Sequence, residues 1–142
     1  MLYEPAVLVD EHRDSDLAAR LEAHLDAGRR RDVMRLFMEE AGGIPDVSRV
    51  PWWPGEVDMD LAGTVVRENR AVEAYELPDE PDTTVPTLLL TGEDSPTHLR
   101  DGIRALAERL PDSRRVEFEG VGHVATQSAP KRLATALTEF VQ

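Results

Sequence analysis

An alternation of strand and helix patterns in the last third of the chain constrains its fold more than any other feature. The apolar run at residues 87–91 predicts a buried strand, and a helical pattern follows at about 97–110. A second strand pattern at 115–119 is followed by a second helical pattern at 131–141. Because a helix joining two strands of one sheet makes a right-handed crossover, we expect these strands to be parallel neighbours. The pattern predicts the α/β fold class.

The first part of the chain combines one short strand with helices. Residues 2–9 are mostly apolar or β-favouring and predict a short strand, which Pro5 restricts to an edge, an end or a strand-to-loop transition. Leucines recur every fourth residue at Leu17, Leu21 and Leu25, which predicts a helix from about residue 14 to Gly28. Further helices are expected at about 31–41 and 58–75, separated by a proline-rich loop and followed by an acidic loop at 77–82.

Composition excludes several classes of function. The chain has no cysteine, and its four histidines (His12, His24, His98 and His123) are scattered, so we expect neither a metal site nor another cofactor. A net charge of −12 opposes binding to nucleic acid or to anionic lipid. There is no apolar run of membrane-spanning length and no signal-peptide pattern at the start, so we expect a soluble, cytoplasmic protein.

Candidate chemical groups follow the two C-terminal strands. Asp94 lies in the loop after the first of them and His123 in the loop after the second, 29 residues later by subtraction (123 − 94). Active-site groups of open parallel sheets lie beyond the carboxyl ends of the strands, where neighbouring loops meet. A carboxylate beside an imidazole there can fix the tautomer of the histidine, which then accepts a proton from a nucleophile. Taken singly, an aspartate such as Asp94 is more often a turn or helix-cap residue than a catalytic one, and His123 is more often an ordinary loop histidine. Their position together, at the ends of consecutive predicted strands, favours a catalytic origin.

The order and spacing of these segments resemble the C-terminal acid and histidine region of α/β-fold hydrolases. The opening residues resemble the strand that follows the nucleophile-bearing helix of that family, and the helices up to Tyr75 resemble its lid. The resemblance implies a partial α/β-hydrolase fold: a short parallel sheet of about three strands with flanking helices and a helical lid. It also implies a strand in residues 1–10, a lid in 11–82 and a βαβα unit in 83–142. The motifs that carry it are VPTLLLTGEDSP, LAERLP and EGVGH.

By this resemblance, Asp94 is the acid and His123 the base of a catalytic triad, with Glu93 as a second candidate for the acid. The nucleophile of the family lies on a G-x-S-x-G elbow before the lid, and this sequence contains no such elbow. Ser95 adjoins the expected acid and does not replace the missing serine. We therefore expect the C-terminal portion of a serine-type hydrolase for a small apolar ester or similar acyl substrate, inactive as this chain alone.

Other interpretations remain open at the level of sequence. The chain can be a non-catalytic remnant that binds a small apolar ligand, associates with itself, or pairs with another chain through an exposed sheet edge. A separately encoded N-terminal half can complete the site in trans. Trp52, Trp53 and the nearby methionines are consistent with an apolar acyl pocket, but such residues more often serve packing.

Overall fold

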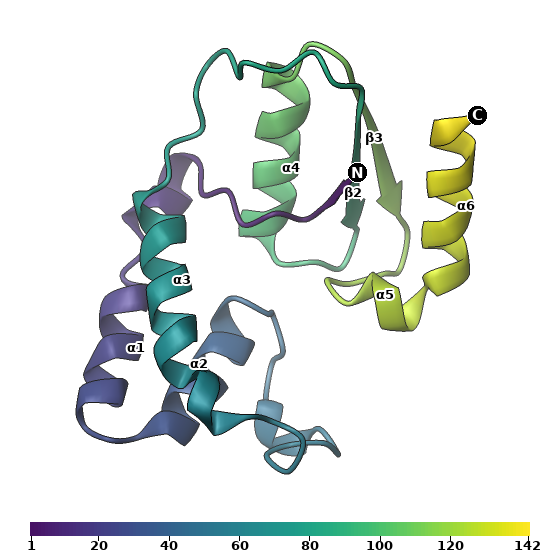
Figure 1. Ribbon diagram of the computed structural model, residues 1–142. Coiled ribbons are helices and arrows are strands. Elements are labelled where there is room, and N and C mark those ends of the chain that lie inside the picture. Colours follow the sequence, from purple (N-terminus) through teal and green to yellow (C-terminus); the bar gives the residue numbers. More distant parts are fainter. The chain divides into compact units, whose positions relative to one another are not determined.

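The computed structural model describes residues 1–142, which form two compact units (Figure 1). The sheet unit comprises residues 1–12 and 76–142, and the helical unit comprises residues 13–75. The division into a strand at 1–10, a lid at 11–82 and a C-terminal unit at 83–142 stays a prediction, as does the lid role of the helices. The sheet unit contains β1 (Leu2–Tyr3), β2 (Thr87–Gly92), α4 (Thr97–Arg109), β3 (Ser113–Phe118), α5 (Ala125–Ser128) and α6 (Pro130–Val141).

The sheet has three parallel strands in the order β1-β2-β3. Leu89 pairs with Leu2 on one side and with Arg115 on the other, and Gly92 at the end of β2 pairs with Phe118 at the end of β3. The strands β2 and β3 are therefore parallel neighbours joined through α4, as expected. The predicted fold class and the predicted sheet of about three strands are confirmed.

Both faces of β2 are covered. Leu88, Leu89 and Leu90 are each fully buried, which is why this strand is continuously apolar and not alternating. Leu89 packs on one face with residues of α4, including Ile103, whereas Leu88 and Leu90 pack on the other with Phe118 and with residues of α5 and α6. Figure 1 shows α4 and α6 on opposite sides of the sheet.

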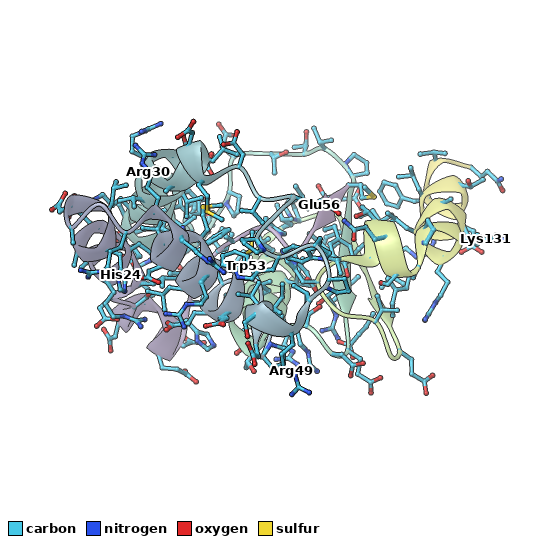
Figure 2. All side chains as sticks on the ribbon, turned by 90° about the horizontal axis from the view of Figure 1, so that it is seen from below. His24, Arg30, Arg49, Trp53, Glu56 and Lys131 are labelled. Carbon is cyan, nitrogen blue, oxygen red and sulfur yellow. The ribbon has the colours of Figure 1, made fainter.

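The helix α6 is amphipathic. Its Ala136 is buried in the cluster beneath the sheet, with the partly buried Leu133 and Phe140 packed against that cluster. Lys131, the only lysine of the chain, is exposed on the outer side of α6 (Figure 2). The apolar positions at a spacing of three to four residues thus account for one helix face on the sheet and one in solvent.

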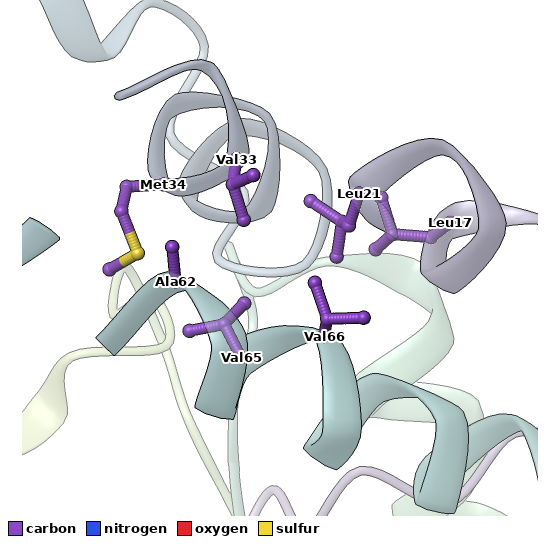
Figure 3. Close-up of a cluster of buried hydrophobic side chains, with 7 residues drawn as sticks. All are labelled: Leu17, Leu21, Val33, Met34, Ala62, Val65 and Val66. Carbon is purple, nitrogen blue, oxygen red and sulfur yellow. The ribbon is translucent and has the colours of Figure 1, made fainter. Parts of the chain in front are cut away.

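The helical unit has its own core. It is formed by α1 (Leu17–Asp26), α2 (Arg30–Glu40) and α3 (Ala62–Ala74), whose apolar faces meet as expected from their sequence periodicity (Figure 3). Leu21 and Val33 are completely buried at its centre. The full buried cluster consists of Leu17, Leu21, Val33, Met34, Ala62, Val65 and Val66.

The loop between α2 and α3 completes this core. Trp53, labelled in Figure 2, packs against the buried cluster together with Met38 and Met59. The guanidinium carbon of Arg31 lies 5.7 Å from the centre of the Trp53 ring, a cation–π distance. These aromatic and methionine side chains therefore contribute to packing, which is the more common of the two roles considered for them.

The structure differs from the sequence prediction in several elements. The N-terminal strand was expected over residues 2–9, but β1 contains only Leu2 and Tyr3 because the backbone turns at Glu4 and Pro5 has no N–H for a ladder. A short 3-10 helix, Met59–Leu61, precedes α3 where one longer helix was expected. The short helix α5 was not predicted, since its four residues have too little sequence to show a period.

Candidate active site

The loops that follow β2 and β3 lie against each other, as expected for parallel neighbours. The Glu93 N–H donates to the Phe118 carbonyl at 3.0 Å, and the Asp94 N–H donates to the Val121 carbonyl at 3.0 Å. Gly92 makes this approach possible, because a Cβ at that position would lie 2.0 Å from the Val121 oxygen. The loop that carries His123 is thus fixed to the end of β2 by backbone contacts.

The two acids predicted as partners of His123 do not contact it. The side chains of Glu93 and Asp94 are both exposed. The Glu93 carboxylate accepts a hydrogen bond from the Gly120 N–H at 3.0 Å, at the turn before His123. Asp94 acts through its backbone N–H, and no hydrogen bond joins its carboxylate to the imidazole. A catalytic role for Asp94 therefore stays a prediction without a supporting contact.

The carboxylate beside His123 belongs to Glu4. The Oε2 atom of Glu4 lies 2.7 Å from Nδ1 of His123, although the two residues are 119 positions apart in sequence. The side chain of Glu4 is fully buried, while that of His123 is 36% exposed. The Nε2 atom of His123 makes no hydrogen bond within the chain. The arrangement holds one nitrogen of the ring against a buried carboxylate and leaves the other available.

Donors surround the second oxygen of Glu4. Its Oε1 accepts hydrogen bonds from the Thr91 hydroxyl at 2.7 Å and from the Gly92 N–H at 2.8 Å. Burial by itself raises the pKa of the Glu4 carboxyl, but the hydrogen bonds from His123, Gly92 and Thr91, together with the nearby Ser95 hydroxyl, lower it below its ordinary value. Glu4 is consequently an ionised, buried carboxylate at neutral pH.

The backbone of Glu4 is left-handed. Its φ of 41° is uncommon for a residue with a long side chain, and such a conformation costs on the order of 1–3 kcal/mol. The Glu4 N–H still donates to the Leu90 carbonyl at 3.1 Å, so the residue remains attached to β2 while the chain turns away. The turn at the carboxyl end of β1 aims the side chain across β2 toward the His123 loop.

Tyr3 braces the same loop. Its hydroxyl donates to the Gly122 carbonyl at 2.7 Å, and its ring centre lies 6.4 Å from that of His123. Burial of the phenol, and secondarily the charge of Glu4, raise the pKa of Tyr3 to about 12. Tyr3, the last residue of β1, thus holds the backbone of this loop, and Glu4, the next residue, holds its imidazole.

The remaining histidines of the sheet unit form a separate contact. His12 Nε2 lies 3.0 Å from Asp101 Oδ2, and the ring of His98 is edge-on to that of His12 at 6.1 Å. No group of three or more histidine, aspartate or glutamate side chains is arranged to hold a metal ion. None of the helices combines the length and apolarity that a bilayer crossing requires.

Comparison with known proteins identifies the architecture. No family model and no curated protein matches the sequence. Among solved structures, an α/β-hydrolase from Sphaerobacter thermophilus matches with a TM-score of 0.73 and 30% sequence identity, over 99% of this chain and 56% of that one. VinJ matches with a TM-score of 0.44 and 20% identity, over 95% of this chain and 49% of that one.

The chain is a partial α/β-hydrolase. It spans about half the length of each of the two solved structures that it matches. The resemblance inferred from the acid and histidine motifs is confirmed at the level of the fold, because the match extends over nearly the whole chain. The match concerns the fold and identifies no substrate.

Four of the five serines of this partial α/β-hydrolase donate hydrogen bonds away from His123. The hydroxyls of Ser15, Ser48, Ser113 and Ser128 donate to Glu73, Asp46, Ala107 and Val124, respectively. Ser95 is buried in the loop after β2, on the Glu4 side of the site. No serine hydroxyl is hydrogen-bonded to His123, and the Ser95 hydroxyl is buried without a hydrogen-bond partner.

Sequence reasoning missed Glu4 and Tyr3. Two signals in the sequence pointed to Glu4. Pro5 marks where the predicted strand must stop, and Glu4 is a carboxylate at that carboxyl end. The strand was instead extended to residue 9, which placed Glu4 within it and not at its end. The partial α/β-hydrolase therefore has a third loop at its crevice that the two-loop interpretation omitted.

Proposed function

We propose that this chain provides the general base of a serine-type hydrolase that acts on ester or similar acyl substrates. The observation that carries the proposal is the partly exposed His123, whose Nδ1 is held by the buried, ionised Glu4. An imidazole so held has its Nε2 lone pair available to accept a proton from an attacking hydroxyl. The similarity to an α/β-hydrolase supports the reaction class.

Two parts of the reaction are missing from these residues. The chain has no G-x-S-x-G elbow and hence no nucleophile of the kind this fold uses. The elbow also contributes to the oxyanion hole, and loss of one oxyanion donor alone costs roughly 100- to 1000-fold in rate. We therefore propose that the chain by itself is inactive, and that the nucleophile comes from sequence or a chain beyond these residues.

A chimera tests the proposal. The segment of the Sphaerobacter thermophilus hydrolase that matches this chain is replaced by residues 1–142, so that the elbow of that protein lies beside His123. We expect hydrolysis of a p-nitrophenyl ester by the chimera and none by the 142-residue chain alone. His123→Ala should abolish the turnover of the chimera.

The matched control is His24→Ala, which removes a histidine of the helical unit and should leave turnover unchanged. A folded chimera that hydrolyses the ester equally well with His123→Ala would contradict the proposal. So would turnover by the 142-residue chain alone that disappears in His123→Ala. Near-UV circular dichroism establishes that each protein tested is folded.

A second candidate is a non-catalytic binding module that uses the free edge of β1. The exposed positions of the other edge strand, β3, include Arg114, Arg115 and Glu117, and such charges discourage strand pairing. The β1 edge instead presents the partly exposed Met1 and Leu2. This difference favours self-association, or binding of another chain, at β1.

Sedimentation velocity over a range of protein concentrations tests this candidate. We expect a concentration-dependent larger species that Leu2→Lys removes and Val141→Lys, an exposed apolar position on α6, does not. A monomer at every concentration, with a sharp unfolding transition, contradicts self-association at this edge. Addition of a peptide from the strand that precedes the matched segment in the Sphaerobacter thermophilus hydrolase tests pairing with another chain.

A further inference from the structure

We infer that Glu4, and not Asp94, is the positioning acid of the histidine, so that the carboxylate of this triad comes from the end of β1. The inference deepens the proposed function and rests on it for its catalytic meaning. It is carried by the 2.7 Å contact between Glu4 Oε2 and His123 Nδ1, made by a fully buried carboxylate. Asp94 has an exposed side chain and makes no hydrogen bond to the ring.

The contacts of Glu4 determine where the imidazole proton lies. The carboxylate is ionised and has no proton to donate, so the hydrogen bond to Nδ1 requires the proton to be on the nitrogen. A neutral His123 is therefore the Nδ1–H tautomer, with an unprotonated Nε2. This is the tautomer in which Nε2 can act as a base, and Glu4 acts on the reaction through it.

The strained turn at Glu4 positions its carboxylate beside His123, and packing alone does not require a strained backbone there. A residue at the end of a two-residue strand can leave the sheet with ordinary backbone angles, yet Glu4 is left-handed and buries a carboxylate. Both features place its oxygens between β2 and the His123 loop. Strain that is retained together with a buried charge is characteristic of residues that serve a site.

The donors around Oε1 make Glu4→Gln a decisive variant. Thr91 and Gly92 both donate to Oε1, so an amide at this position satisfies them only when its carbonyl oxygen faces them. The NH2 group then faces His123 and donates to Nδ1, which requires Nδ1 to be unprotonated. Glu4→Gln should therefore transfer the imidazole proton from Nδ1 to Nε2 while the volume of the side chain is preserved.

The experiment is a long-range ¹H–¹⁵N correlation spectrum of the 142-residue chain, which distinguishes the two neutral tautomers of each histidine. His123→Gln assigns the signals of His123 among those of the four histidines. We expect the Nδ1–H pattern in the unaltered chain at a pH where the ring is neutral. In Glu4→Gln the Nδ1–H pattern should be lost and the Nε2–H pattern should replace it.

Asp94→Asn is the matched control, since it makes the same change to the acid on the neighbouring loop. It should leave the tautomer of His123 unchanged. The inference is overturned if Asp94→Asn switches the tautomer, or if Glu4→Gln does not. An Nε2–H pattern in the unaltered chain would also overturn it, and this measurement holds even where a variant fails to fold.

The tautomer is read in the absence of any turnover, so the outcome is independent of the ester assay. A chimera without activity together with the expected tautomer switch would refute the proposed function and retain the Glu4–His123 relationship. An active chimera together with an unchanged tautomer in Glu4→Gln would retain the function and refute the role of Glu4.

Discussion

Glu4 and His123 meet through one 2.7 Å contact although 119 positions separate them. Glu4 reaches the ring because β1 pairs with β2, and His123 reaches it because β3 pairs with β2 on the other side. The central strand also supplies the Thr91 hydroxyl and the Gly92 N–H that hold the carboxylate. The contact therefore depends on the strand order, and it joins the residue after β1 to the loop after β3.

Removal of the Glu4 side chain should destabilise the sheet unit strongly. Glu4→Ala leaves the Thr91 hydroxyl and the Gly92 N–H buried without an acceptor, and we expect the free energy of unfolding to fall by about 3 kcal/mol or more. Asp94→Ala removes an exposed side chain and should change it by no more than about 0.5 kcal/mol. Urea unfolding measures both, and equal losses would show that the buried contacts of Glu4 contribute little.

Stability should decrease in acid partly because of Glu4. Its folded-state pKa is lowered, so its contribution is fully present above the ordinary value of 4.5 and is lost as the pH falls from there through the folded-state pKa. In that window the unfolded state binds more protons than the folded state. Glu4→Gln should show a shallower decline in unfolding free energy below pH 4.5 than the unaltered chain. Parallel curves for the two proteins would contradict this assignment.

Gly92 should tolerate no side chain. A Cβ at this position would meet the backbone oxygen of Val121 at 2.0 Å, and moving that oxygen displaces the loop of His123. We expect Gly92→Ala to cost about 3 kcal/mol, at the upper end for overpacking, and to alter the imidazole signals of His123. Gly55→Ala is the control, because nothing lies within 4 Å of its added Cβ. Thermal unfolding and the histidine spectrum together measure the effect.

Tyr3 should ionise late in an alkaline titration. Its pKa is raised to about 12, so tyrosinate absorbance should include a component near that pH which disappears in Tyr3→Phe and persists in Tyr75→Phe. The raised pKa also means that the contribution of Tyr3 to stability declines as the pH rises from 10.0 toward 12. At neutral pH, Tyr3→Phe loses the hydrogen bond to Gly122 and should cost about 0.5–1.5 kcal/mol. A single titration step common to both tyrosines would contradict the burial of this phenol.

Local patterns were sufficient for most elements of the fold. The run Leu88–Leu90 is apolar on both faces because both faces are covered, so it indicated a parallel strand directly. Leu17 and Leu21 repeat with the helical period because one face of α1 enters the core of the helical unit. In such elements the spacing of apolar residues reflects which faces are buried, and the predictions were made from that spacing.

The site was less accessible to the same reasoning. His123 was found because a glycine turn after a clear strand placed it at the crevice, but its acid was sought on the adjacent loop alone. Asp94 is the nearer in sequence and follows the neighbouring strand, whereas Glu4 lies at the start of the chain, directly after a strand too short to show a period. A two-residue strand carries almost no periodic signal, and Pro5 was the one local mark of its end.

The sequence by itself determined the class of fold and the order of the principal strands and helices, because these depend on local patterns of apolar residues. It also showed that these residues contain no G-x-S-x-G elbow. Only the tertiary structure decided which carboxylate faces His123. That choice depends on the left-handed turn at Glu4 and on the donors that β2 presents to its oxygens. Hydrogen bonds between distant segments stabilise that turn, and no pattern within residues 1–5 encodes them.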